Sequence, residues 1–350
     1  MATTINVRPL GLTPTYNETI VVLESDYVAL TDFKWIIEIY KGAPADTDYT
    51  LLSSIVILPN PDGFGVIDFH RHIENHITTD FYPADKDEVI SRIIKAGLKW
   101  SFKVSEQYGG NPPLNQPFGI DETTIYSFNG ALTFQGFRNW VAADYNMNST
   151  SPNTTKFLTD IPRVYNVTLE DRVWINGLQN DIANPPILGY ITTDNGTYGV
   201  NNQHNATVQT FLVQHKIGPK DLTETTDTTL AALTGSLPAV DANTTFITYT
   251  QSILPISTEV SETITLNIVD KCSKHEAIRF FYMDKLGSYL PITFNKVSKT
   301  NITNTRGNYR QNYGSYDATS NVWGYTTYDR GNTTYDLVSN EKVTCTSDWM

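Results

Sequence analysis

The amino-acid sequence predicts an all-β protein: tandem β-sandwich domains, immunoglobulin- or fibronectin-like and jelly-roll-like, with a few short helices and an extended C-terminal arm. Two observations predict this class. Charged residues make up only 18% of the chain, and its polarity comes instead from threonine, which favours strands, and asparagine, which favours turns. Several short segments alternate apolar with polar residues, the period of a half-buried strand, whereas long runs with helical periodicity are nearly absent.

The chain is expected to divide into three regions. Residues 1–112 are predicted to form an immunoglobulin- or fibronectin-like sandwich, residues 113–300 a second β-rich sandwich with long loops, and residues 301–350 an extended aromatic-rich segment. The Pro/Gly/Asn-rich stretch 108–118 marks the first boundary. Residues 218–245 have no clear period and little bulk, so we expect a linker, an arm or a binding element there.

Strands of the first region are expected at residues 19–23, 33–40, 51–58 and 98–106. In the second of these, Trp35, Ile37 and Ile39 alternate with Lys34 and Glu38. Two short helices are expected before the last strand. The first starts at Asp68 as N-cap and carries Phe69, Ile73 and Ile77 on one face. The second covers residues 85–97 and carries an apolar stripe of Val89, Ile90, Ile93 and Ile94.

Strands of the second region are expected at residues 123–128, 132–137, 164–169, 187–192, 208–214 and 246–251. Residues 264–268, 277–283 and 289–294 then predict a β-meander of consecutive strands. The turn between the last two, Asp284-Lys285-Leu286-Gly287, ends on a glycine that can adopt positive φ.

The C-terminal region combines many aromatic side chains with asparagine, glycine and threonine and has few aliphatic residues. Such a composition does not build a domain core, but aromatic residues dominate the energetics of interfaces. We therefore predict an extended arm that packs on a neighbouring subunit; one or two edge hairpins of the same domain are the alternative. The predicted interface residues are Tyr309, Tyr313, Tyr316, Trp323, Tyr325, Tyr328 and Tyr335.

One histidine cluster has the spacing of a metal site. His72 and His76 are four residues apart, as ligands on a zinc-binding helix are, and Asp68 lies one turn earlier. However, Glu74 does not follow the first histidine directly as in the HExxH pattern, and Arg71 disfavours a bound cation. Histidines on the solvent side of an amphipathic helix are the ordinary explanation, so no metal site is predicted.

The most concentrated carboxylates are Glu170, Asp171 and Asp181. Glycoside hydrolysis needs two carboxyl groups about 5–10 Å apart across a cleft, and a turn after a strand explains Glu170-Asp171 as well. The sequence has no Gly-x-Ser-x-Gly elbow and no Gly-x-x-x-x-Gly-Lys-Ser/Thr phosphate loop. We therefore predict no catalytic residue, no cofactor and no enzymatic activity.

Charge and composition exclude further classes. The formal net charge of −12 repels phosphate backbones, so general nucleic-acid binding is not expected. No apolar run reaches the length of about 18 residues that a membrane-spanning helix needs, and the first residues do not have the pattern of a signal peptide. The only cysteines, Cys272 and Cys345, fit synthesis in a reducing cytoplasm, although they could pair if the C-terminal segment docks on the meander.

Three sets of short motifs carry a resemblance to a known group. They are Cys272 with Ile278-x-Phe280, Leu286-Gly287 and Ile292-x-Phe294; Phe33-Lys34-Trp35 with Glu38-Ile39-Tyr40, the turn 59–63 and Gly65-Val66-Ile67-Asp68; and residues 156–159 with Pro162-Arg163 and Glu170-Asp171. Together they span roughly residues 20–300 and resemble tail-associated virion proteins of phages that infect Bacteroidetes, among them the crAss-like podoviruses. These are packing and turn motifs, so the resemblance concerns architecture and virion context.

The resemblance implies a structural virion protein of the tail or the neck ring beneath the portal, made in the host bacterial cytoplasm. The implied partners are copies of the chain in a ring of roughly six or twelve, built from repeated heterologous contacts, and other tail, neck or portal proteins, without membrane or sequence-specific nucleic acid. The resembling proteins usually continue beyond an Asp-Trp like Asp348-Trp349, so a fragment or a short member is expected. The alternative is a carbohydrate-binding β-sandwich adhesin, in which Trp323, Tyr325 and Tyr328 stack on sugars.

Overall fold

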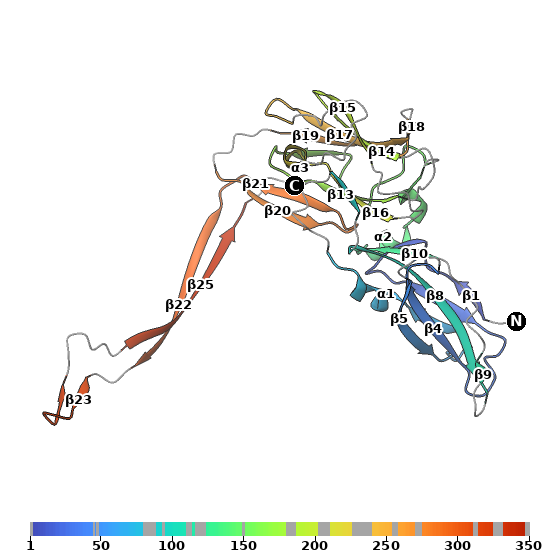
Figure 1. Ribbon diagram of the computed structural model, residues 1–350, viewed down its shortest axis with the longest axis horizontal. Helices are drawn as coiled ribbons and strands as arrows, with labels where there is room; N and C mark the ends of the chain where they lie inside the picture. The colour runs from blue at the N-terminus through green and yellow to red at the C-terminus, as the bar shows by residue number, and fades with distance from the viewer. Residues whose placement is uncertain are drawn as a thin grey trace. The chain divides into compact units, whose positions relative to one another are not determined.

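The computed structural model describes residues 3–44, 46, 49–79, 89–92, 95–109, 114–115, 124–148, 151–179, 187–201, 211–225, 240–253, 258–269, 275–310, 314–324 and 332–346. Strands dominate these residues, as Figure 1 shows, and the helices among them are short: α1 (His70–Ile73), α2 (Phe134–Arg138), α3 (Pro219–Glu224) and the 3₁₀ turns η1 (Glu74–His76) and η2 (Ala142–Tyr145). The all-β prediction is confirmed.

The chain forms two compact units, unit 1 (Met1–Lys271 with Phe281–Ile292) and unit 2 (Cys272–Phe280 with Thr293–Met350).

Unit 1 begins with a sandwich of two sheets, ordered β1-β3-β6 and β2-β10-β8-β4-β5, with β9 paired to β8. Its strands are β1 (Thr4–Val7), β2 (Leu12–Pro14), β3 (Ile20–Glu24), β4 (Lys34–Lys41), β5 (Thr50–Ile57), β6 (Gly65–Asp68), β8 (Gly97–Tyr108), β9 (Leu114–Asn115) and β10 (Ile125–Phe128). These orders match strands A-B-E and G-F-C-C′ of an immunoglobulin sandwich. The fully buried Trp35 occupies β4, the strand that corresponds to C.

The core of this sandwich follows from the alternation seen in the sequence. In β4 every second side chain is buried, from Trp35 to Ile39, and these side chains meet Trp100 and Phe102 of β8. Each buried indole N–H has a partner, as buried tryptophans require: Trp35 Nε1 donates to Thr3 Oγ1 (3.0 Å) and Trp100 Nε1 to Ser127 Oγ (2.9 Å). Periodicity therefore located the inward face of this sheet correctly.

Both predicted helices of the first region need correction. The helix at residues 68–77 is only α1 followed by η1, and its N-cap is Phe69; the Asp68 carboxylate instead accepts the backbone N–H groups of Thr19 and His70. The helix over residues 85–97 is wrong where the chain is described, because Ile90–Arg92 is strand β7 and Gly97 starts β8. A short apolar run fits a buried strand as well as a helix, and periodicity alone does not separate the two.

The strand predicted at residues 132–137 is also wrong, because this segment contains helix α2. Thr133 caps the helix: its Oγ1 accepts the N–H of Gly136 at 3.2 Å. Capping satisfies a backbone donor that has no partner inside the helix. The capping hydrogen bond of Thr133 therefore favours a helix here, although the neighbouring residues favour a strand.

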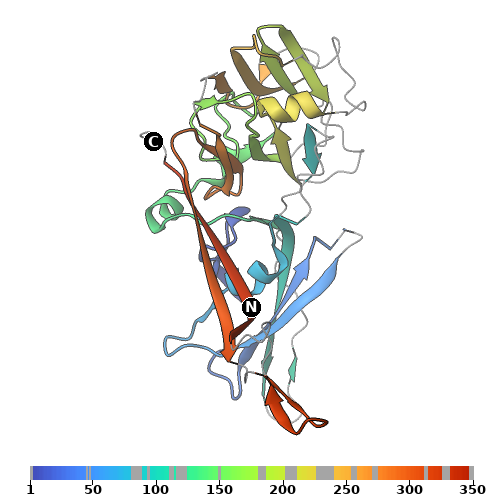
Figure 2. The same cartoon turned by 90° about the vertical axis from the view of Figure 1, so that its left-hand side faces the viewer.

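A second sandwich completes unit 1, as Figure 2 shows from the side. One sheet has the order β20-β21-β13-β16-β7, with β11 paired to β13, and the other β12-β19-β17-β14-β15, with β18 paired to β17. The strands are β11 (Asn146–Met147), β12 (Val164–Val167), β13 (Trp174–Gln179), β14 (Ile187–Thr193), β15 (Gly196–Asn201), β16 (Phe211–Lys216), β17 (Phe246–Ile253), β18 (Thr258–Glu259), β19 (Ile264–Ile268), β20 (Ile278–Met283) and β21 (Tyr289–Phe294). Apolar side chains of both sheets share one core.

The predicted β-meander is half right: β20 and β21 are neighbours in one sheet, as expected, but β19 does not pair with β20. Strand β19 pairs in parallel with β12 and antiparallel with β17, whereas β20 and β21 belong to the opposite sheet. Alternation shows which side chains of a strand face the core, here Ile264 and Leu266. It does not specify the partner strand: β17 is a near neighbour of β19 in the sequence, whereas its other partner, β12, lies about a hundred residues earlier.

The turn after β20 is fixed by one buried carboxylate. Asp284 accepts hydrogen bonds from the backbone N–H groups of Asp160, Leu286 and Ser288 and from Thr159 Oγ1, all between 2.7 and 3.0 Å. Burial raises the pKa of Asp284, while these bonds act in the opposite direction. Gly287 takes φ +86°, as the sequence predicted for this turn, and a Cβ there would lie 2.3 Å from the Asn129 carbonyl oxygen.

Unit 2 contains the C-terminal segment, which forms two hairpins. β22 (Lys299–Arg310) and β25 (Asn332–Thr344) run side by side as a long antiparallel ribbon, and β23 (Ser315–Asp317) pairs with β24 (Val322–Gly324) (Figure 1). Neither hairpin extends a sheet of the sandwiches. The hairpin alternative is therefore right about local structure, but these are not edge hairpins of the second sandwich. The boundaries at residues 112 and 300 stay predictions.

Candidate interaction surface

The histidine cluster does not have the geometry of a zinc helix. Regular helix ends at Ile73, so His72 and His76 lie on α1 and on the 3₁₀ turn η1 and do not share one α-helical face. His70 Nδ1 lies 2.8 Å from Asp68 Oδ2. Among the residues described, no group of three His, Cys, Asp or Glu side chains is placed to hold a metal ion.

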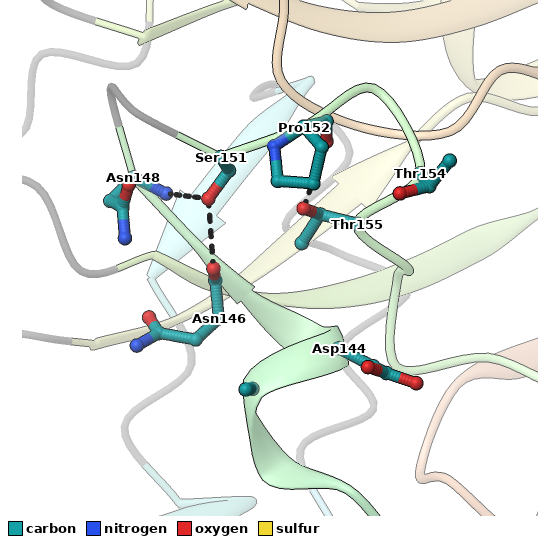
Figure 3. Close-up of a pocket in the computed structure, with 8 residues that line it drawn as sticks. Asp144, Asn146, Asn148, Ser151, Pro152, Thr154 and Thr155 are labelled. Atoms are coloured by element: carbon teal, nitrogen blue, oxygen red, sulfur yellow. Dashed lines mark hydrogen bonds between the residues drawn. The ribbon is translucent and has the colours of Figure 1, made fainter.

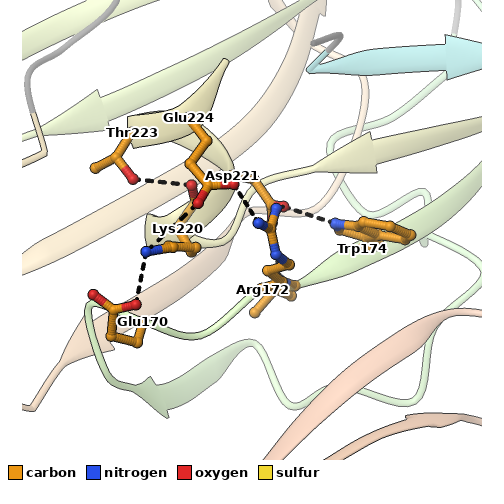
Figure 4. A network of polar contacts seen from close by, with 8 residues as sticks. Glu170, Arg172, Trp174, Lys220, Asp221, Thr223 and Glu224 are labelled. Atoms are coloured by element: carbon orange, nitrogen blue, oxygen red, sulfur yellow. Dashed lines mark hydrogen bonds and ion pairs between the residues drawn. The ribbon is translucent and has the colours of Figure 1, made fainter. Parts of the chain in front are cut away.

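The carboxylates near residue 170 belong to a structural network that fixes helix α3, drawn in Figure 4. Glu170 pairs with Lys220 at 2.7 Å, and buried Asp171 accepts the N–H of Thr168 in the turn after β12. Arg172 pairs with Asp221 (2.9 Å) and with Glu224. These contacts support the turn interpretation of Glu170-Asp171; Asp181 lies outside the described residues.

Asp221 is the buried centre of this network. Its carboxylate accepts Trp174 Nε1–H at 2.9 Å, besides the Arg172 guanidinium. Burial raises the pKa of Asp221 to about 6, although the contacts with Trp174 and Arg172 act to lower it. The carboxylate is enclosed by protein donors, so its surroundings are those of a structural anchor for α3 on β13.

A histidine with a strongly shifted pKa lies in the core of the second sandwich. Burial lowers the pKa of His215 to about 3. Its Nδ1 lies 2.7 Å from Tyr249 Oη, and its ring packs against Phe157 at 5.5 Å between centroids. The backbone of Gly177 lies close to the His215 ring, because a Cβ on Gly177 would lie 3.1 Å from His215 Nε2. Perturbed pKa values often mark active sites, but this fully buried group is enclosed by core side chains.

One polar hollow of about 310 Å³ lies beside η2 and β11. Figure 3 shows that its lining comes from a single stretch of chain, residues 143–155. Ser151 Oγ accepts the Asn148 N–H (2.9 Å) and donates to the Asn146 carbonyl oxygen (3.1 Å), so its hydroxyl serves the loop itself. Groups for nucleophilic or acid–base catalysis do not converge in it.

The remaining candidate for a functional surface is the C-terminal ribbon formed by β22 and β25. Nearly every described side chain of β22 and β25 is exposed, on both faces of the ribbon. Directly opposite residues of an antiparallel pair share a face, and successive residues alternate between faces. The register therefore divides the ribbon into two distinct surfaces.

The aliphatic face carries Ile302, Leu337 and Val343. Ile302 lies opposite Glu341, Leu337 opposite Arg306 and Val343 opposite Thr300. All three aliphatic side chains are exposed, Ile302 to 64%. Sequence reasoning missed this surface because it looked for aromatic density; a period-two reading of β22 with its partner would have found it.

The aromatic face carries Tyr309 and Tyr335. Their ring centroids are 6.1 Å apart, and Tyr335 is 70% exposed. The pairing register shifts at Gly307, and a Cβ there would lie 2.9 Å from the Tyr335 ring. Glycine therefore makes room for the tyrosine ring on the neighbouring strand, an arrangement that pins strand register.

A second aromatic pair lies on the small hairpin. Tyr316 and Trp323 are directly opposite each other on β23 and β24, and Trp323 is 47% exposed. The Tyr316 hydroxyl donates to Asn321 Oδ1, next to the turn. Of the seven predicted interface residues, the structure thus places Tyr309, Tyr316, Trp323 and Tyr335 on exposed hairpins; Tyr313, Tyr325 and Tyr328 lie outside the described residues.

Comparison with known proteins adds no assignment: no protein-family model matches the chain, and no curated protein matches it. Within the described part of the chain, no helix has the length and apolar character needed to cross a membrane. Cys345 has a free thiol, and Cys272, its proposed partner, lies outside the described residues.

Proposed function

We propose that the chain is a structural subunit of a tailed-phage virion, in the tail or in a neck ring or collar, that assembles through contacts between subunits. Its partners are copies of itself, in a ring of roughly six or twelve, and neighbouring tail, neck or portal proteins. The proposal assigns no catalytic role and no cofactor. The virion setting rests on the motif resemblance, and the assembly role rests on the ribbon.

The observation that carries the assembly role is the exposure of the ribbon. A two-stranded hairpin alone is marginally stable in water, because it needs a third strand or a packed face to bury apolar surface. β22 and β25 extend over 12 and 13 residues and bury almost none of them. Among the described residues, β22 and β25 pair only with each other, and a strand edge that no further strand covers readily accepts another chain. Contact with other subunits supplies the missing burial.

The test is the mass of the assembly in solution. The full chain and a chain that ends at Val297 are compared by sedimentation equilibrium over a range of concentrations. The shorter chain keeps every residue of the three hydrophobic core clusters, the last of which is Leu290. We expect a closed oligomer for the full chain and a monomer for the shorter one. A full chain that stays monomeric, or a shorter chain that assembles equally well, contradicts the proposal.

A carbohydrate-binding adhesin is the second candidate, and the exposed Tyr316–Trp323 pair is the observation that favours it. Exposed aromatic rings of this kind can stack on sugar faces. A glycan array with the full chain tests this role. Binding that is lost in Trp323→Ala, but kept in Val322→Ala on the same strand, supports it; an array without binding leaves the assembly role as the better explanation of the exposed hairpins.

A further inference from the structure

The outer face of the β1-β3-β6 sheet carries a row of three valines. Val7 pairs with Val22, and Val22 pairs with Val66, so the side chains lie side by side across the strands. Their neighbours Val21 and Ile67 point into the core, so the valine row points outward. Val7 and Val66 are 45% and 51% exposed. We call this surface, together with the adjacent exposed Ile20, the valine face.

Acidic residues surround the valine face. Glu18 precedes β3, and Glu24 and Asp26 lie at its other end; Asp62 precedes β6 and Asp68 ends it. The basic side chains of this region are Arg8, after β1, and His70, whose Nδ1 lies 2.8 Å from Asp68 Oδ2. An apolar row within an acidic rim selects a partner that combines aliphatic side chains with positive charge.

The aliphatic face of the ribbon has this chemistry. Ile302, Leu337 and Val343 are exposed on it, and Arg306 lies on the same face. Strand β22 carries Lys299, Arg306 and Arg310 and no acidic residue, although the whole chain has a net charge of −12. Strand β25 adds Lys342, Asp336 and Glu341, and Glu341 lies on the aliphatic face opposite Ile302. The two strands together carry four basic and two acidic residues, so the ribbon is net basic on an acidic protein.

We infer that the aliphatic face of the ribbon of one copy packs on the valine face of a second copy. Two sheets packed face to face lie about 10 Å apart and interdigitate their side chains. The contact joins two different surfaces, so each copy offers one of each and the contact can repeat around a ring. The inference rests on the proposed function and names the surfaces that carry it; the aromatic face of the ribbon stays available for other contacts.

Full-chain variants test each surface separately. Val66→Asp places a charge in the valine face, and Leu337→Asp places one in the aliphatic face of the ribbon. The matched controls are Val56→Asp, an exposed valine on β5, and Val338→Asp, the next residue along β25, which points to the opposite face. Sedimentation equilibrium then gives the dissociation constant of each variant. We expect at least a tenfold weaker association for the two test variants and wild-type association for the controls.

Mixing separates this arrangement from its alternatives. Val66→Asp retains a functional ribbon and Leu337→Asp retains a functional valine face, so an equal mixture should form dimers that cannot grow. If either variant associates on its own as strongly as the wild type, like surfaces pair; if the mixture stays monomeric, the ribbon of one copy does not bind the valine face of another. Either result overturns the inference. If Val66→Asp unfolds, as judged by circular dichroism, Val7→Asp replaces it at the other end of the row.

The outcomes also separate this inference from the proposed function. If the wild-type chain assembles and the two test variants assemble like their controls, the inference is wrong while a structural role remains supported. If the wild-type chain is monomeric at every concentration, the proposed self-assembly fails, and the named contact fails with it.

Discussion

The second sandwich of unit 1 and the ribbon of unit 2 are both built from β-strands that contain threonine and asparagine. The sandwich buries its apolar side chains, whereas the ribbon exposes them. In the sandwich, side chains such as Phe157 and Ile191 are completely buried between two sheets. In the ribbon, Ile302 and Leu337 remain exposed. The difference shows that strand-forming composition and burial are separate properties: strands form in both places, but only the sandwich is stabilised by its own core.

The largest expected difference is between alanine substitutions of a buried and of an exposed phenylalanine, measured as the loss in free energy of unfolding. Phe157 is fully buried, whereas Phe134 is 80% exposed. We expect Phe157→Ala to lower the free energy of unfolding by about 4 kcal/mol, because it leaves a cavity in the core. The same change at Phe134 should alter it by less than about 0.5 kcal/mol. Urea denaturation of both variants measures the difference, and equal losses would show that the core is not packed as described.

Glycine substitutions test the backbone of the two units. Gly287 has φ +86°, and a Cβ there would lie 2.3 Å from the Asn129 carbonyl oxygen, whereas Gly324 on the small hairpin has nothing within 4 Å. We expect Gly287→Ala to lower the free energy of unfolding by about 2–3 kcal/mol. Gly324→Ala should be close to neutral. Thermal denaturation followed by circular dichroism checks both; a neutral Gly287→Ala would disprove the turn geometry.

Acid should destabilise the sandwich through His215. Burial lowers its pKa from 6.5 to about 3, so below pH 6.5 the unfolded chain binds a proton that the folded chain does not. The stability contributed by neutral His215 is therefore complete above pH 6.5 and decreases by about 1.4 kcal/mol for each pH unit below it. The raised pKa of Asp221 has the opposite sign, because its folded carboxyl binds a proton more readily than the unfolded one.

The difference in unfolding free energy between the wild type and His215→Gln isolates the histidine, since both chains share Asp221. We expect this difference to shrink between pH 6.5 and pH 4.5. A difference that is constant over this range would mean that His215 can be protonated in the folded state. The ribbon strands contain no histidine. At each pH, the amides of the ribbon should therefore exchange equally fast in the wild type and in His215→Gln.

The smallest effect concerns the ribbon itself. Tyr335→Ala removes the ring that covers Gly307 and contacts Tyr309. Cross-strand aromatic pairs contribute roughly 0.2–1 kcal/mol, so amides of β22 and β25 should exchange with solvent a few times faster in the variant. Asn340→Ala, on the same strand but opposite Thr303 and away from the tyrosine pair, is the control. Unfolding of unit 1 should not change; a large loss there would mean that the ribbon contributes to its core.

The fold class and much of the local structure follow from short-range patterns in the sequence. Alternation places Trp35, Ile37 and Ile39 on one face of a strand because side chains in β-structure point to opposite sides, and the structure buries them. The glycine of the 284–287 turn was recognised for the same kind of reason, since positive φ favours a residue without Cβ. Aromatic density singled out the C-terminal segment, in which Tyr316, Trp323 and Tyr335 are exposed, but it did not identify the aliphatic face.

Strand pairing and the exposure of particular surfaces became clear only from the folded structure. Strand β19 pairs with β12, which lies about a hundred residues earlier in the chain. The apolar run at β7 becomes a strand because the distant β16 supplies its partner. The valine face emerges only when β1, β3 and β6 align Val7, Val22 and Val66 in one row. Local preferences act over a few residues, whereas pairing and burial depend on contacts between segments far apart in sequence, so no local pattern contains them.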